Sequence, residues 1–287
     1  MPSSSLRTLV HQLAGLGTDG VSCPQQVLAA LGLVPDPRHR RGVRHPITGI
    51  LVIAICAVAS GARSFTAMAE WAADTAAVLL AQIGVGTPDP STIRRTLIRM
   101  NAEAFDQALA GWTQTATEPA VVAADGKDVR GAKNGGGTTV RLLSALDQES
   151  TVVLAQVEVG AKSNEIPMLP VLLDRIQDVE GMVVTADALH AQRSHAEYLH
   201  DRGAHYLVTV KGNQPSLHRQ LRSLPWKQVC PGHREREYAR GRITIRTIKA
   251  VAIEADIDFP HAAQVVLITP GGARSREARG APSSATR

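Results

Sequence analysis

The order of secondary-structure elements after residue 118 most constrains the fold of this chain. Apolar or β-branched runs bounded by turn residues predict strands at 120–124, 139–146, 151–159, 181–186 and 205–210. The first three strands follow one another directly, whereas helical patterns at 164–176, 192–202 and 215–224 separate or follow the last two. Hairpin-linked strands followed by alternating helices and strands require a mixed sheet with helices on its faces. We therefore predict an α/β fold for this part.

The preceding 115 residues are predicted to be helical throughout. An apolar run at 47–62 reads as a buried helix, and Ser64 and Ser91 are predicted N-caps of two further helices. Two proline-rich breakers, at 35–46 and 87–91, interrupt the pattern. We predict a helical domain over 1–115, an α/β core over 116–269 that contains a β-hairpin insertion at about 234–257, and a disordered tail over 270–287.

Composition limits the classes of protein that this chain can be. Three widely separated cysteines, Cys23, Cys56 and Cys230, exclude a disulfide framework and a cysteine zinc site, and they suit a reducing cytoplasm. The apolar run at 47–62 is shorter than the roughly 20 residues of a membrane helix, so we expect no membrane partner. Of the net charge of +5, four arginines and one glutamate in 270–287 contribute +3. A nucleic-acid partner is therefore permitted, but it depends on where the remaining charge lies.

Two predicted apolar strands each end in an aspartate, Val-Val-Ala-Ala-Asp125 and Val-Val-Thr-Ala-Asp187. If the strands are parallel neighbours, both carboxylates lie at one edge of the sheet, where Mg²⁺ is the natural counter-ion. A pair of such ions about 3.5–4 Å apart supports phosphodiester chemistry. Each residue also has a simpler explanation, because Asp125-Gly126 is a common hairpin turn and Asp187 could cap a helix. The residues alone leave these alternatives open.

Several ordered motifs carry a family resemblance. They are Pro35-Asp-Pro-Arg-His-Arg-Arg-Gly-Val-Arg-His-Pro46, Pro90-Ser-Thr-Ile-Arg94, Asp125-Gly-Lys127, Lys162-Ser-Asn-Glu-Ile166, Thr185-Ala-Asp-Ala-Leu-His190 and Val210-Lys-Gly-Asn-Gln214. From about residue 5 to residue 268, the chain resembles the H-repeat-associated transposases, which are bacterial insertion-sequence proteins of the DDE class.

The resemblance implies a ribonuclease-H-like catalytic core with Asp125 and Asp187 as the first two acidic metal ligands. It implies Mg²⁺, with Mn²⁺ as a substitute, and double-stranded DNA as partner, at both transposon ends and target. The implied reaction is hydrolysis of DNA at the transposon ends, followed by attack of the freed 3′-hydroxyl on target DNA. A homo-oligomer assembled on DNA and a place in the bacterial cytoplasm, at the nucleoid, are further implications.

The chain departs from the family pattern at its third acidic ligand. In the family this ligand is a glutamate on a helix after the β-insertion, whereas here the resemblance stops near Ile268 and 270–287 resembles out-of-frame translation. Glu235, Glu237 and Glu254 lie in the insertion hairpin and are not assigned the missing role. We therefore expect a truncated and catalytically defective transposase. The rival readings are a non-catalytic DNA-binding remnant that inhibits the intact enzyme, and a metal-dependent nuclease of the same fold.

Basic residues are the candidates for DNA contact. Four arginines lie within seven positions of the first proline-rich loop, namely Arg38, Arg40, Arg41 and Arg44. Such a cluster can hold a phosphate backbone through bidentate contacts, although charge clusters are usually solvated surface. Lys127 and Lys211 follow the two motif strands and could reach a phosphate near the metal site, or could be ordinary surface lysines. His190 and Asn164 are explained more simply as residues at helix starts.

Overall fold

A computed structural model of the chain describes residues 25–274 apart from 75–76, 83, 116, 134–135, 161–162, 240–241 and 254–256. The chain divides into two compact units, residues 1–209 and 210–287. Residues 1–24 of the predicted helical domain lie outside the described residues.

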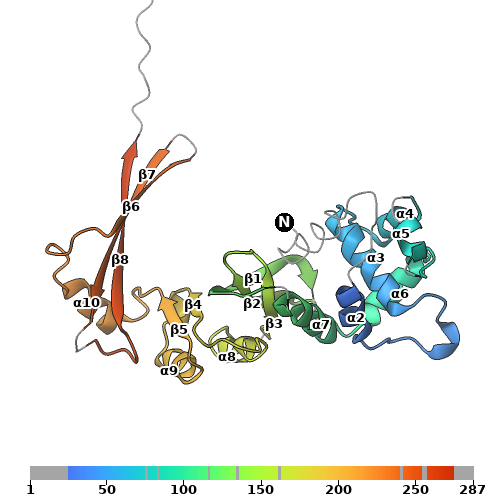
Figure 1. Cartoon of the computed structure of the whole chain (residues 1–287), viewed down its shortest axis with the longest axis horizontal. Helices are drawn as coiled ribbons and strands as arrows, with labels where there is room; N and C mark the ends of the chain where they lie inside the picture. Colours follow the sequence, from blue (N-terminus) through green and yellow to red (C-terminus); the bar gives the residue numbers. More distant parts are fainter. Residues whose placement is uncertain are drawn as a thin grey trace, which may run out of the picture. The chain divides into compact units, whose positions relative to one another are not determined.

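The N-terminal part of the first unit is helical, as predicted (Figure 1). Its helices are α2 (Gln25–Gly32), the 3-10 turn η1 (Arg40–Gly42), α3 (Ile47–Ala59), α4 (Phe65–Asp74), α5 (Ala77–Gln82), α6 (Pro90–Arg99) and α7 (Ala102–Thr115). Helix α3 is the apolar run, and most of its residues are buried between its neighbours, with Leu51 and Ile53 fully enclosed. It is a core helix, and no helix among the described residues is long and apolar enough to span a membrane.

Side-chain caps set the starts of two of these helices. The Ser64 hydroxyl accepts a hydrogen bond from the Ala67 N–H at 3.1 Å, which confirms the predicted cap of α4. The predicted cap at Ser91 is wrong. Asp89 caps α6 instead, because Pro90 occupies the first helical position and the Asp89 carboxylate accepts the Ser91 N–H at 2.8 Å.

The second part of this unit is built on a five-stranded mixed sheet with the order β3-β2-β1-β4-β5. Its strands are β1 (Val121–Lys133), β2 (Thr139–Asp147), β3 (Val153–Glu158), β4 (Val183–Ala186) and β5 (His205–Val208). Strand β2 is antiparallel to both β1 and β3, and β4 and β5 run parallel to β1. This order and these directions are those of the predicted ribonuclease-H-like fold, so the predicted fold class is confirmed.

The apolar face of this sheet is covered by two of the helices that follow β3. These are α8 (Met168–Leu173) and α9 (Arg193–Asp201), with the 3-10 turn η2 (Ala188–His190) between β4 and α9. Leu172 of α8 and Leu199 of α9 share one buried cluster with Val122 and Val184 of the sheet. The two helices also meet directly, since the Tyr198 hydroxyl donates to Asp174 Oδ1 at 2.6 Å.

Two predicted element boundaries that bear on the candidate site are wrong. Strand β1 does not end at Asp125 but runs eight residues further, pairing Asp125 with Ser144 and Gly126 with Leu143 of β2. The Asp125-Gly126 turn alternative is therefore excluded, because the reversal comes only after Lys133. Helix α8 is also shorter than the predicted 164–176, since Asn164 instead closes a turn by accepting the Ile166 N–H at 3.1 Å.

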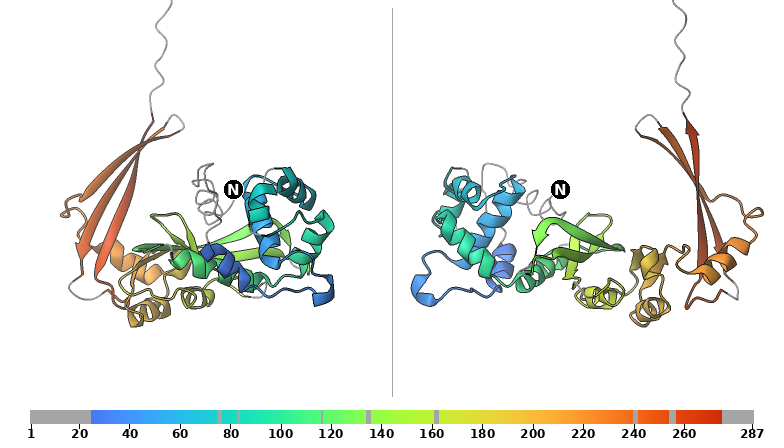
Figure 2. Two further views of the ribbon diagram at one scale, coloured as in Figure 1. Left: turned by 45° about the vertical axis from the view of Figure 1, so that its right-hand side comes forward. Right: turned by 180° about the vertical axis from the view of Figure 1, so that it is seen from behind.

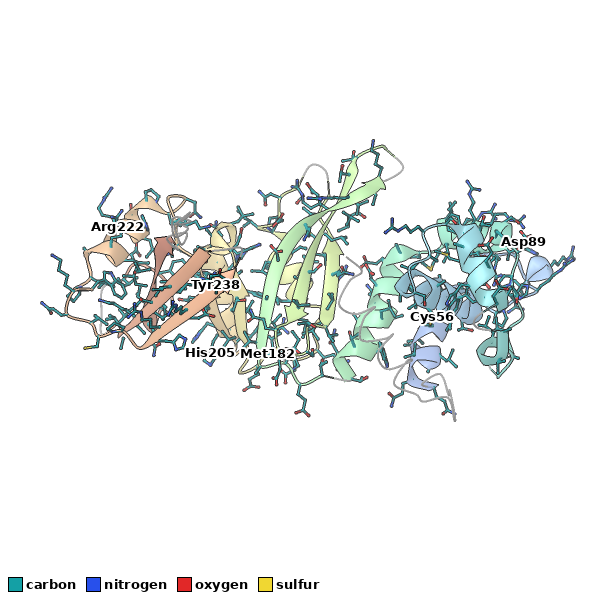
Figure 3. All side chains as sticks on the ribbon, turned by 90° about the horizontal axis from the view of Figure 1, so that it is seen from above. Cys56, Asp89, Met182, His205, Arg222 and Tyr238 are labelled. Atoms are coloured by element: carbon teal, nitrogen blue, oxygen red, sulfur yellow. The ribbon has the colours of Figure 1, made fainter. Side chains whose placement is uncertain are left out.

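The amino ends of β4 and β5 lie together at the far end of these strands from Asp187. Figure 3 labels Met182 and His205 there, and the His205 N–H donates to the Met182 carbonyl at 2.8 Å. The carboxyl ends of the same two strands therefore point toward the edge where functional groups were predicted to gather.

Helix α7 is joined to the sheet rather than separated from it. The Thr113 hydroxyl donates to the Val153 carbonyl at 3.2 Å, and the Gln114 amide donates to the carbonyls of Leu154 and Arg175, each at 3.0 Å. The predicted domain boundary at 115/116 therefore falls inside one compact unit, because the last turn of α7 makes hydrogen bonds to β3.

The second unit contains α10 (Pro215–Ser223) and a three-stranded antiparallel sheet, β6 (His233–Ala239), β7 (Arg242–Ala252) and β8 (Gln264–Arg274). Figure 2 shows the strands side by side along their length. The predicted hairpin at 234–257 corresponds to β6 and β7, whereas β8 was not predicted. Residues 270–274, expected to begin a disordered tail, pair with β7 from Arg242 to Arg246, and residues 275–287 lie outside the described residues.

One carboxyl group of α7 makes the stability of the first unit depend on pH. Burial raises the pKa of Asp106 from 3.8 to about 6; Arg175 opposes this shift and Glu103 adds to it. A pKa raised by folding means that the carboxylate destabilises the fold above pH 6. Stability from this group is therefore gained as the pH falls from about 6 toward 4.

We expect Asp106→Asn to stabilise the first unit at pH 7.5 by about 1–2 kcal/mol, a value discounted for partial exposure of the side chain. The gain should vanish at pH 4, where the wild-type carboxyl is protonated. Denaturant melts of both proteins at the two pH values measure it. Asp74→Asn, on the exposed end of α4, is the matched control. An equal gain at both pH values would contradict the assignment to ionisation.

Candidate active site

Asp125 and Asp187 come directly after the last two residues that pair between the neighbouring parallel strands β1 and β4. The register of β1 and β4 pairs Val122 with Val184 and ends at Ala124 and Ala186, so the two aspartates are the next residues on each strand. Both side chains are exposed. The condition set by the sequence, that the two strands be parallel neighbours, is met, and the two aspartates occupy equivalent positions at one edge.

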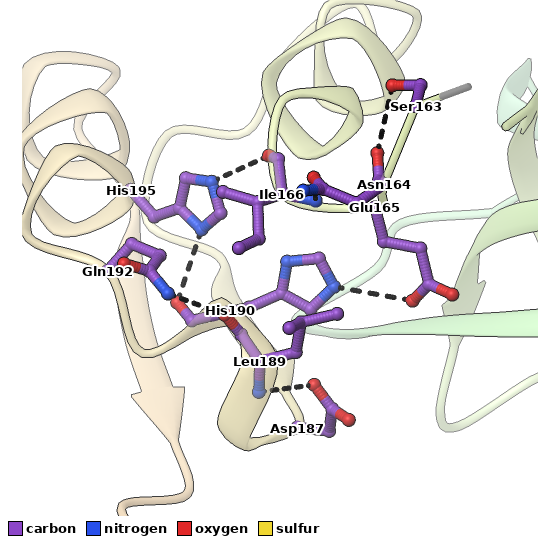
Figure 4. A network of polar contacts seen from close by, with 9 residues as sticks. All are labelled: Ser163, Asn164, Glu165, Ile166, Asp187, Leu189, His190, Gln192 and His195. Carbon is purple, nitrogen blue, oxygen red and sulfur yellow. Dashed lines mark hydrogen bonds and ion pairs between the residues drawn. The ribbon is translucent and has the colours of Figure 1, made fainter. Parts of the chain in front are cut away.

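The sheet opens directly beside these aspartates. Strand β4 stops at Ala186 and the chain turns into η2, whereas β1 continues along β2. Asp187 Oδ1 accepts the Leu189 N–H at 2.9 Å, so the capping role foreseen for Asp187 is real (Figure 4). One carboxylate oxygen of Asp187 holds the turn, and this interaction fixes where the carboxylate lies.

A third carboxylate, from Glu165, lies next to this edge and was not among the residues predicted from the sequence. Its carboxylate covers Gly126 so closely that a Cβ atom at that position would overlap it. Burial raises the pKa of the Glu165 carboxyl, Arg141 opposes the shift, and then Asp187 and Asp125 raise it further. All three acids therefore share one electrostatic neighbourhood. The only signal in the sequence was the Lys-Ser-Asn-Glu-Ile motif itself, whose glutamate was given no role.

Two buried histidines lie beside the carboxylates (Figure 4). His190 is 1% exposed, and its Nε2 lies 3.9 Å from Glu165 Oε2. Burial lowers the pKa of His190, as does His195, whereas Asp187 and Asp125 act in the opposite direction. His195 contacts two backbone carbonyls, that of Ile166 through Nε2 at 2.9 Å and that of His190 through Nδ1 at 3.2 Å. It thereby ties the segment that carries Glu165 to η2, which Asp187 caps.

The chemistry of these donors fits a divalent cation. Carboxylate oxygens are the ligands that Mg²⁺ and Mn²⁺ prefer, and two of the three acids lie at equivalent register positions. Within the described residues, no group of three or more acidic, histidine or cysteine side chains is already arranged as a complete metal site. Binding therefore requires the side chains of Asp125 and Glu165 to reorient toward that of Asp187, on a backbone that already brings Asp125 and Asp187 to one edge.

The two lysines that were predicted to contact DNA lie in different parts of the chain. Lys127 is exposed on β1, two residues beyond Asp125, and it pairs with Leu142 in the sheet register. Lys211 is exposed three residues after the end of β5, at the start of the second unit. Their contact with DNA stays a prediction.

The four arginines of the proline-rich loop are not equivalent. Arg38 is mostly enclosed: its guanidinium makes two hydrogen bonds to Asp36, at 2.8 and 2.7 Å, and one to the His45 carbonyl at 2.8 Å. Arg40, Arg41 and Arg44 are exposed. Arg38 therefore braces the loop from within, and the other three present their charges to solvent.

Comparison with known proteins gives the family. The family model described as "Transposase DDE domain" matches residues 116–268, and the model described as "DDE_Tnp_1-associated" matches residues 28–113. The first match alone covers more than half of the chain. This chain belongs to the DDE transposase family. DDE domains use divalent metal ions, which agrees with the acidic edge described above.

Relatives in Escherichia coli support the narrower resemblance. The chain is 32% identical over 201 residues to the "Putative transposase YncI" of strain K12, covering 68% of this chain and 81% of that protein. It is 30% identical over 214 residues to the "H repeat-associated putative transposase YbfD", covering 71% and 84%. The resemblance to the H-repeat-associated group is thus confirmed. In the O157:H7 form of YncI, at 33% identity over 201 residues, 51% of the relative is covered, about half of its length.

Among solved structures, a piggyBac transposase synaptic complex with hairpin DNA matches with a TM-score of 0.37 and 11% identity, over 85% of this chain and 56% of that one.

Proposed function

We propose that this DDE transposase binds double-stranded DNA and cleaves it in a divalent-cation-dependent reaction, with Asp125 and Asp187 as metal ligands. The observation that carries the proposal is the β1–β4 register, which ends one residue before each aspartate. When bound, Mg²⁺ or Mn²⁺ would polarise the scissile phosphate and activate the attacking oxygen. The substrates are the ends of an insertion sequence, followed by a target duplex.

The residues of the chain supply position and charge. Asp187 is oriented by its hydrogen bond to the Leu189 N–H, and Asp125 is held in register by β2 on one side. The open edge beyond Ala186 gives a phosphodiester backbone access to both. Exposed Lys127 follows on the same strand and can neutralise a neighbouring phosphate.

The test is DNA cleavage by the purified full chain. Linear duplexes that carry the genomic flanks of the coding region, and unrelated duplexes of equal length, are incubated with Mg²⁺, with Mn²⁺ or with EDTA. If the cation site is complete as proposed, nicks with free 3′-hydroxyl ends and joined products form only with metal and only on the flank duplexes, whereas the defect expected from the sequence predicts binding without cutting.

Two outcomes would contradict this proposal. Binding without cutting under either metal would favour the non-catalytic remnant, and it would agree with the expectation of a defective enzyme. Cutting without joining, and without preference for the flanks, would favour a nuclease. Robust cleavage with joining would instead contradict the expected defect.

A further inference from the structure

We propose that Glu165 is the third carboxylate of the cation site formed with Asp125 and Asp187. This inference rests on the proposed function, since it completes the ligand set of the same site. It also bears on the expected defect, which was argued from the absence of a third acidic ligand. The glutamate comes from the segment between β3 and α8, not from a position after the β-insertion.

The first argument is the fit between Glu165 and Gly126. Gly126 lies on the same face of β1 as Val122 and Ala124, the face that α8 covers. Because Gly126 has no side chain, the Glu165 carboxylate can lie directly against the strand, one residue beyond Asp125. Any other residue at this position would push the carboxylate away from the edge.

The second argument is the open edge. Asp125 and Gly126 point to opposite faces of β1, so Asp125 and Glu165 approach the strand from opposite sides. Pairing with β4 has already ended at Ala124, so no neighbouring strand separates the two faces at this edge. Carboxylates that come from opposite faces of β1 can therefore reach the same cation. Asp187, at the equivalent position after β4, approaches the same place from the neighbouring strand.

The third argument is His190, which is independent of the acids. Its ring is almost fully buried, and neither ring nitrogen has a hydrogen-bond partner among the described residues. Buried polar groups nearly always have such a partner. The Nε2 atom is directed at the Glu165 carboxylate, at a distance too long for a direct hydrogen bond (Figure 4). This imidazole can therefore hydrogen-bond to a cation-bound ligand or to a reoriented Glu165.

The other acids considered for a third role are used differently. Glu235 and Glu237 both pair with Arg246 across β6 and β7, at 3.6 and 3.1 Å. Glu254 lies outside the described residues. Glu165, in contrast, is next to the aspartates and is held there by its neighbours: the Ile166 N–H is bound by Asn164 and the Ile166 carbonyl by His195.

The experiment measures Mn²⁺ binding by electron paramagnetic resonance on the metal-free full chain, so its result does not depend on activity. We expect Glu165→Gln to weaken Mn²⁺ binding by about tenfold or more, the scale of losing one oriented carboxylate near a metal. Glu158→Gln, at the exposed end of β3, removes an equal charge and should leave affinity within about twofold. Thermal melts by circular dichroism check that each variant is folded.

Gly126→Ala gives a second test that leaves every acid in place. The added methyl group should displace Glu165 and weaken Mn²⁺ binding to a similar extent. Because both changes act on the same carboxylate, the double variant should be no weaker than Glu165→Gln alone. Additive losses would contradict the contact between the two residues.

The outcomes separate this inference from the proposed function. If Asp125→Asn and Asp187→Asn lose Mn²⁺ but Glu165→Gln binds it as the wild type does, the site exists and Glu165 is not part of it. If the wild type binds no Mn²⁺, or if none of the three variants weakens binding, the cation site itself is wrong and this inference is wrong with it.

Discussion

Replacing Asp187 with asparagine is expected to reduce metal-dependent DNA cleavage by about three orders of magnitude or more. Loss of one charged ligand removes several kcal/mol of charge stabilisation at the phosphate, and each 1.36 kcal/mol corresponds to about tenfold in rate. The fold should survive, because asparagine can still accept the Leu189 N–H and is a good cap. Asp125→Asn should have an effect of similar size, since its position in the register is equivalent.

The measurement is the single-turnover rate of strand cleavage with Mn²⁺, which tolerates weaker ligand sets than Mg²⁺. The matched control is Asp201→Asn, at the exposed end of α9, which makes the same change in charge away from the edge. A rate for Asp187→Asn within about tenfold of the wild type would contradict its role as a ligand.

Removing the three exposed arginines of the proline-rich loop together is expected to weaken DNA binding by about 100-fold or more. Each charge-assisted hydrogen bond to a phosphate contributes about 1–2 kcal/mol. The slope of log affinity against log salt should also fall by about 0.9 for each lost phosphate contact. The triple variant is Arg40→Ala, Arg41→Ala and Arg44→Ala, and fluorescence anisotropy over a range of salt concentrations measures both quantities.

Two further variants separate charge from loop structure. Lysine at the same three positions keeps the charge, so the salt slope should be retained while affinity falls, because lysine lacks the bidentate geometry of arginine. Arg38→Ala should leave the slope unchanged, because that guanidinium is already paired with Asp36. A loss of slope for Arg38→Ala equal to that of one exposed arginine would show that Arg38 also contacts DNA.

The fold class could be predicted from the sequence because the patterns that indicate its strands and helices are local and strong. The wholly apolar stretches before Asp125 and Asp187 specify buried strands, and the order of hairpins and crossovers then allows few sheets. The ends of the helices and strands were harder to predict from the sequence. The length of β1 beyond Asp125 depends on its partner β2, and the strand that includes 270–274 depends on β7, so neither appears in a local pattern.

The candidate site was only partly predictable, for a related reason. Asp125 and Asp187 could be paired because parallel strands bring equivalent positions together. Glu165 and Gly126 are 39 positions apart in the sequence, and a turn held by Asn164 and His195 brings them together. No periodic pattern in the sequence predicts this contact. Likewise, the pairing of Arg38 with Asp36 distinguishes it from its exposed neighbours only in three dimensions.

The hydrogen bonds between the end of α7 and β3 have a mechanical consequence. Thr113 and Gln114 join the helical bundle to the five-stranded sheet through these hydrogen bonds, which restrict rotation of the bundle relative to the sheet. A DNA duplex bound to the bundle would consequently lie at a constant distance from the edge that carries Asp125 and Asp187. Under the proposed function, the spacing between the bound sequence and the cleaved bond would therefore be fixed.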